Sequence, residues 1–270
     1  MATRRPTGLI PEDPSPNDEL FGSLFRSAPE IKSEVFLTDH FRYDLDQWPN
    51  NSCVWFALSN AVWAAQSLAG IQKQDRMLIS PPFGYYYTLR RQHGQSEKLV
   101  DKGVKPSQAV EVLNGLGACD WSDWPHDPTK PTRCLTEPPG NLAIRATDND
   151  GDWIKLVRLD GWGADRIKQF KQSYSMPIPR PVIAGLSLDA AYMDLTDGIW
   201  PGRTGTLEGR HMVTFNAFDE LGPYPVTSWG PEWAIGGIGH MSWDALISAE
   251  TTDLYSVWVD VDKMPRKRDA

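Results

Sequence analysis

The strongest constraint on this chain is a run of residues, 54–68, that is apolar on most sides of a helix. Residues 50–52 (Asn-Asn-Ser) stand where an N-cap belongs, and Gly70 closes the run. A helix that is apolar on most sides must be buried on most sides. The sequence therefore predicts a central helix inside a core, which 270 residues with 40% apolar content can supply. The apolar residues recur at helical spacing: Val54, Trp55, Leu58, Ala61, Val62, Ala65 and Leu68.

The remaining periodic segments predict an α+β fold. Further helices are expected over residues 107–116 and 164–172, and residues 120–152, rich in Asp, Pro and Trp, are expected to form a long loop region. Helices followed by antiparallel strands are typical of α+β proteins, and a helical half facing a β half leaves a cleft for chemistry. The strands are predicted after residue 180, over residues 182–186, 212–218, 224–229 and 255–259.

The two ends of the chain differ from this central part. Residues 1–35 are polar and proline-rich and predict an extended or partly disordered arm, with one short amphipathic turn at Leu20, Phe21, Leu24 and Phe25. Residues 36–262 are expected to form the main domain, with a helical lobe at about 50–125 and a β lobe at about 180–260. Residues 263–270 form a short basic tail.

Composition excludes several classes of function. A net charge of −8 gives no attraction for a phosphate backbone, so no nucleic-acid partner is expected. No run of 18 apolar residues suggests a membrane span, and residues 1–14 lack the apolar core of a secretory signal. We therefore expect a cytoplasmic protein with its three cysteines mostly reduced, whereas pairing of Cys119 with Cys134 and the oligomeric state stay open.

Cys53 is the candidate nucleophile. It stands at the first turn of the predicted central helix, where free backbone N–H groups and the helix dipole stabilise a thiolate and should lower the thiol pKa. A thiolate is the nucleophile that acyl transfer requires. Residues 47–57 (Gln-Trp-Pro-Asn-Asn-Ser-Cys-Val-Trp-Phe-Ala) resemble the active-site segment of papain-like cysteine proteases, in which a Gln precedes the Cys by six residues. The resemblance implies that Gln47 donates to the oxyanion beside the Cys53 N–H.

Two later segments extend the resemblance. Residues 209–215 (Gly-Arg-His-Met-Val-Thr-Phe) resemble the segment that carries the catalytic His at the start of a strand, which implies that His211 is the general base and acid. Residues 226–233 (Val-Thr-Ser-Trp-Gly-Pro-Glu-Trp) resemble the Asn-Ser-Trp-Gly-x-x-Trp motif, whose Asn orients the His and whose Trp shields that bond. Thr227 stands at the Asn position and could orient His211 through Oγ1 or a bridging water, while Trp229 matches the Trp.

The resemblance covers most of residues 36–260 and implies a papain-like two-lobed fold. Its helical lobe, with a central buried helix, would pack against an antiparallel β-barrel-like lobe. The implied activity is a cysteine peptidase that acts on peptides or proteins through a Cys–His pair, with no metal or organic cofactor. Gly103 and Trp229 would contact the substrate, Gly103 at an edge that pairs with its backbone.

This sequence also departs from the family pattern. Asn50 replaces the family's Cys three residues before the nucleophile, so the usual disulfide is missing. The arm is shorter than the common inhibitory prodomain, so activation by self-cleavage is not implied. Two other functions stay open: a catalytically silent peptide-binding module, favoured by Thr227, and an acyltransferase or amidase that uses the same thioester.

Overall fold

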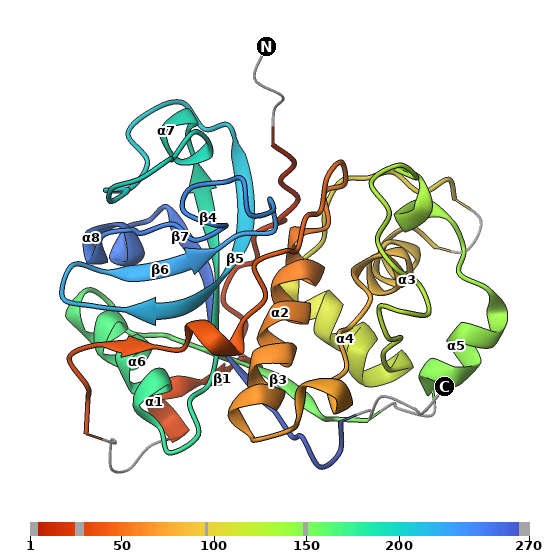
Figure 1. Cartoon of the computed structure of the whole chain (residues 1–270), viewed down its shortest axis with the longest axis horizontal. Coiled ribbons are helices and arrows are strands. Elements are labelled where there is room, and N and C mark those ends of the chain that lie inside the picture. The colour runs from red at the N-terminus through yellow and green to blue at the C-terminus, as the bar shows by residue number, and fades with distance from the viewer. Residues whose placement is uncertain (1–4, 25–29, 95–96, 148–150, 265–270) are drawn as a thin grey trace.

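The computed structural model describes residues 5–24, 30–94, 97–147 and 151–264, which form a helical half and a sheet-containing half (Figure 1). The helical half holds α2 (Cys53–Leu68), α3 (Pro81–His93), α4 (Pro106–Leu116) and α5 (Gly140–Thr147). The chain leaves it through β3 (Ile154–Arg158) and builds the sheet and the helices that cover it. The α+β class is confirmed.

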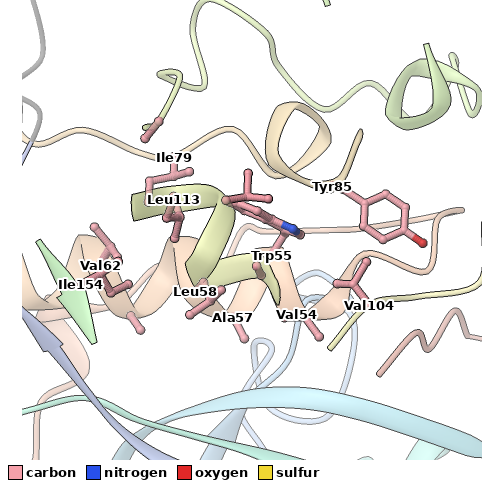
Figure 2. Packing of buried hydrophobic residues seen from close by; sticks show 14 of the residues in the cluster. Val54, Trp55, Ala57, Leu58, Val62, Ile79, Tyr85, Val104, Leu113 and Ile154 are labelled. Carbon is pink, nitrogen blue, oxygen red and sulfur yellow. The ribbon is translucent and has the colours of Figure 1, made fainter. Parts of the chain in front are cut away.

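The central helix α2 has the position that its sequence predicts. Every residue from Cys53 to Ser67 is buried, and Figure 2 shows apolar side chains from α2, α4 and neighbouring segments packed around it. Ser52 is the N-cap residue, but its side chain makes no capping bond. The start of the helix is held instead through the N–H of Asn51, which donates to the carboxylate of Asp101 at 3.1 Å.

Helix α3 is not predicted by the apolar pattern. It begins in the way that its first residues allow, because Ser80 Oγ accepts from the Phe83 N–H at 3.3 Å and prolines occupy the first helical positions. Gly84 faces α2, where a Cβ would lie 2.2 Å from the Trp55 ring. Because Gly84 has no side chain, the indole of Trp55 can pack against α3.

Adding one methyl group at Gly84 should destabilise the fold. We expect Gly84→Ala to lower the free energy of unfolding by about 1–3 kcal/mol, the usual cost of overpacking. Gly115→Ala is the matched control: it also lies in a helix, its Cβ would meet nothing within 4 Å, and it should gain roughly 0.5–1 kcal/mol of helix propensity. Urea denaturation measures both changes, and equal gains at the two positions would contradict the tight Trp55 contact.

The sheet is open and mostly antiparallel. Its order is β1-β3-β7-β4-β5-β2 with β6 paired to β5, and only β1 and β3 run parallel. In the described part of the chain, β1 ends the sheet on one side, and β2 and β6, each paired with β5 alone, end it on the other, so the sheet does not close into a barrel. The strands are β1 (Glu19–Leu20), β2 (Val35–Phe36), β4 (Val182–Leu188), β5 (Gly209–Phe218), β6 (Pro223–Val226) and β7 (Thr251–Val259).

Strand β4 is covered on both faces. All seven of its residues are buried. Ile183 packs into the cluster around α2, whereas Val182 and Ala184 belong to the cluster of α6 (Ala164–Ser175) and α8 (Trp243–Ile247). Because alternate side chains of a strand point to opposite faces, the sheet is a layer between α2 and the helices of the second half.

Other elements refine the sequence predictions. The helices expected at 107–116 and 164–172 are present, but α5 and the 3₁₀ turn η3 (Arg133–Leu135) lie in the stretch expected to be a loop, and β3 is not predicted. The amphipathic turn of the arm is α1 (Phe21–Leu24), with Phe21 buried, while Phe25 lies outside the described residues. The short elements that remain are η1 (Thr38–His40), η2 (Lys73–Asp75) and α7 (Ala190–Met193).

Candidate active site

Cys53 lies where the two halves meet. As the first residue of α2 it is fully buried, and its Sγ accepts a hydrogen bond from the Met212 N–H of β5 at 3.4 Å. The sulfur at the start of the central helix is therefore held by the strand that carries His211.

His211 lies beside this contact, one residue before Met212. It is fully buried, and neither ring nitrogen has a hydrogen-bond partner among the described residues. The Trp229 ring lies against the imidazole, with ring centroids 4.3 Å apart. Both nitrogens are thus unpaired among the described residues, and Trp229 covers one side of the ring.

Burial keeps both groups neutral in this structure. It raises the pKa of Cys53 to about 12, and the backbone N–H groups of Met212, Val54 and Cys53 itself oppose that shift only in part. It also lowers the pKa of His211 to about 3. The lowered thiol pKa expected from the helix position is therefore wrong for the covered site, because loss of water outweighs the helix terminus.

Gln47 is fixed by hydrogen bonds on both sides of its amide. Its Oε1 accepts from Ser228 Oγ at 2.6 Å, and its Nε2 donates to the Asn50 carbonyl at 2.6 Å. The same Nε2 lies 3.4 Å from the Thr7 carbonyl and 3.5 Å from the Pro6 carbonyl. The amide that the resemblance assigns to an oxyanion is thus directed at backbone carbonyls of the arm.

Thr227 does not contact His211 by a hydrogen bond in this structure. Its Oγ1 is buried without a partner among the described residues. Trp229, two residues later, donates through Nε1 to the Pro6 carbonyl at 2.8 Å. Trp229 therefore contacts His211, but no described side chain forms a hydrogen bond with the imidazole.

Residues 5–10, the cleft segment, lie between the two halves of the molecule (Figure 1). The N–H groups of Gly8 and Leu9 donate to the Arg210 carbonyl at 3.1 and 3.2 Å. On the opposite side, the Ile10 N–H donates to the Val104 carbonyl and the Val104 N–H to the Gly8 carbonyl, at 3.1 and 3.0 Å. The cleft segment, which belongs to the arm predicted to be extended, thus crosses the candidate site as an extended strand.

Leu9 anchors the cleft segment. Its side chain is buried in the same apolar cluster as Cys53 and Met212, with only 6% of its surface exposed. It reaches Gly185 of β4, where a Cβ would lie 2.3 Å from Leu9 Cδ2. A recess over Gly185, the β4 residue that pairs with Met212, therefore accepts a leucine.

Two glycines allow the close approach of backbones. Gly103 has φ +88°, and a Cβ on it would lie 2.0 Å from the Gly8 carbonyl oxygen. A Cβ on Gly8 would lie 2.0 Å from the Asn51 carbonyl oxygen, and its φ is +142°. The edge at which the sequence predicts substrate pairing is thus occupied by the arm.

Sequence reasoning missed one supporting residue, Asp101. Its carboxylate accepts from the Asn51 N–H and from the Tyr85 hydroxyl, at 3.1 and 2.6 Å, and the same hydroxyl accepts from the Gly103 N–H at 2.9 Å. Asp101 thereby ties the start of α2 to the Gly103 edge. Residues 101–103 (Asp-Lys-Gly) form no recognisable motif, so no sequence signal pointed to this role.

Other expectations concern the rest of the chain. All three cysteines are free, so Cys119 and Cys134 do not pair. Within the described ranges, no cluster of His, Cys, Asp and Glu could hold a metal ion, and no helix is long and apolar enough to cross a membrane. Most of the basic tail, residues 265–270, lies outside the described residues.

Comparison with known proteins identifies the fold. No protein-family model matches the sequence, and no match is found among curated proteins. Xylellain, a cysteine protease from Xylella fastidiosa, is similar with a TM-score of 0.76 at 20% identity, over 96% of this chain and 99% of xylellain. Procathepsin L2 from Tenebrio molitor larval midgut has a TM-score of 0.67 at 14% identity, over 95% of this chain and 78% of its own. Bromelain from Ananas comosus, in complex with the E64 inhibitor, has a TM-score of 0.59 at 13% identity, over 85% of this chain and 99% of the bromelain chain. The chain therefore has the fold of the papain-like cysteine proteases.

Proposed function

We propose that this protein is a cysteine peptidase whose own cleft segment covers its active site. The observation that carries the proposal is a thiol at the start of the central helix, bonded to β5 next to His211 and lying under an extended peptide strand. That strand is held by backbone hydrogen bonds on both sides, which is how a cleft binds any peptide irrespective of its side chains.

Each residue has a role in the proposed reaction. Cys53 Sγ attacks the scissile carbonyl carbon while its proton passes to His211, which then gives the proton to the leaving amine. Water attacks the resulting thioester, releases the acid product and restores the thiol. Gln47 Nε2 donates to the oxyanion of each tetrahedral intermediate, since the same nitrogen already faces the carbonyls of Pro6 and Thr7.

Thr227 and Trp229 would act on the imidazole. Thr227 Oγ1, unpaired in the covered site, is available to accept from His211 once the ring is charged, directly or through water. Trp229 keeps solvent from the ring face that it covers. Both are positioning residues for His211.

The direction of a substrate follows from the proton transfer. The leaving amine must depart toward His211, so the fragment after the scissile bond lies on the Trp229 side and the fragment before it lies on the Gly103 side. A substrate would thus run from Gly103 toward Trp229. The cleft segment runs the other way, with Pro6 at Trp229 and Leu9 paired in parallel with Val104. It lies in the cleft in a direction unsuited to cleavage.

Thiol labelling with the epoxide E64 tests the proposed nucleophile. We would treat the full-length chain and its Leu9→Asp variant, in which a carboxylate would have to be buried where Leu9 packs over Gly185. Intact mass and peptide mapping should locate one adduct, on Cys53, formed faster in the variant. Cys119 and Cys134 are internal controls, because both are buried and burial raises the pKa of each.

The same experiment addresses the alternative of a silent peptide-binding module. That function is favoured by one observation: no side chain in the described part of the chain forms a hydrogen bond with His211. It predicts that Cys53 of the Leu9→Asp variant reacts no faster than the two control thiols. Such a result would contradict the peptidase.

A further inference from the structure

A second cavity lies next to Trp229, outside the Cys53–His211 pair. It has a volume of about 830 Å³ and extends from Trp229 to the end of α7. Four carboxylate side chains line it: Asp46, Asp194, Glu208 and Glu232. Among the described residues that line the cavity, the one cation is Arg5 of the cleft segment.

Arg5 shows what kind of group this cavity accepts. Its Nε donates to the Met193 carbonyl at 3.1 Å, and its guanidinium carbon lies 5.5 Å from the centre of the Trp229 ring. Burial lowers the pKa of Arg5, and the charges of Asp194 and Asp46 oppose that shift. A guanidinium is therefore held by a carbonyl, an aromatic ring and a negative field, the three partners that suit it.

Arg5, which lines the cavity, belongs to the segment that a substrate must displace. Pro6 accepts from Trp229, and Leu9 donates to the Arg210 carbonyl and packs over Gly185, so a peptide bound across Cys53 takes the place of both. Once Arg5 leaves, the cavity keeps its four carboxylates and loses its described cation. The vacated site then favours a cationic side chain and disfavours an anionic one.

The position of the cavity decides which part of a substrate it meets. Trp229 lies on His211, and His211 must face the leaving amine. The cavity is therefore on the side of the fragment that follows the scissile bond.

We propose that this cavity is a subsite that selects lysine or arginine among the first few residues after the scissile bond. The inference rests on the proposed peptidase function and deepens it, because it names the substrate class. The recess that holds Leu9 would contact the other side of the bond, so the two preferences are independent.

Matched peptides test the subsite in the full-length Leu9→Asp variant. Internally quenched peptides would share all residues before the scissile bond and carry Arg, Gln or Glu at each of the following positions in turn. At one or more positions we expect kcat/KM to be at least about tenfold higher for Arg than for Glu, with Gln between them. The ratio should shrink in 0.5 M salt, because exposed charges are screened.

Variants assign the preference to the cavity. Asp194→Asn combined with Glu232→Gln should reduce the Arg-to-Glu ratio to about a third or less. Asp197→Asn is the control, since Asp197 lies three residues from Asp194 but lines a different pocket, and it should leave the ratio unchanged. Equal turnover of all peptides, or a ratio that survives the double substitution, would overturn the subsite and leave the peptidase intact. No turnover of any peptide, with no adduct on Cys53, would overturn both proposals.

Discussion

Cys53→Ala is expected to lower peptidase activity by more than about a thousandfold. Removing the nucleophile of a Cys–His pair removes the covalent route altogether, and loss of one member of such a catalytic unit costs about as much as loss of all. The measurement is kcat/KM on a quenched peptide, in the Leu9→Asp background so that the cleft is open.

Folding should survive this substitution. The Met212 N–H loses its sulfur acceptor, which costs about 1 kcal/mol. Cys119→Ala is the control, because this buried thiol packs with Phe83 and Leu142 in a separate cluster and should keep full activity. A Cys53→Ala protein that still cleaves the peptide would disprove the mechanism.

Leu9→Asp is expected to raise the activity of the full-length chain about thirtyfold or more. Burying a leucine side chain contributes about 2 kcal/mol, so its loss shifts the balance between covered and open cleft by that factor. A charged carboxylate in the same recess adds a desolvation penalty. The gain should appear in kcat/KM and equally in the rate of Cys53 labelling, because both require an open cleft.

Leu20→Asp is the matched control for this gain. Leu20 belongs to the same arm but lies in β1, away from the cleft, and is 38% exposed. It should leave the activity of the full-length chain unchanged. If Leu9→Asp and the unmodified chain turn over peptide at the same rate, the cleft segment does not inhibit.

The parts of the fold that could be predicted are those whose burial follows a simple period. Helix α2 is buried on every side and apolar along most of its length, β4 is buried throughout, and β5 is buried from His211 onward. Helix α3 was missed because polar residues such as Arg90 and Arg91 and its two initial prolines obscure the apolar pattern. The Ser-Pro-Pro sequence before Phe83 was the available signal, since it combines an N-cap with prolines at the first helical positions.

The site could be predicted only in part, for a different physical reason. Cys53, His211 and Gln47 stand out in the sequence because they match the motifs of the papain-like family, and their catalytic roles stay predictions. The position of the cleft segment could not be predicted, because most of its hydrogen bonds are made by backbone atoms of Gly8, Leu9 and Ile10, and a single buried leucine forms no sequence pattern. The raised pKa of the Cys53 thiol could not be predicted either, because it follows from the burial of the sulfur in the folded chain.

The parallel pairing of β1 with β3 has a consequence for how the cleft is reopened. Phe21 is buried and Asp18 forms an ion pair with Arg158 at 2.5 Å, so the chain stays fastened there when residues 5–10 lift away. Because it is tethered, the cleft segment competes with substrate at an effective concentration of about millimolar. A peptide substrate at a much lower concentration therefore binds less often. One backbone cut between residues 10 and 18 would release residues 5–10 from this tether. The cut segment could then diffuse away, and the cleft would stay open.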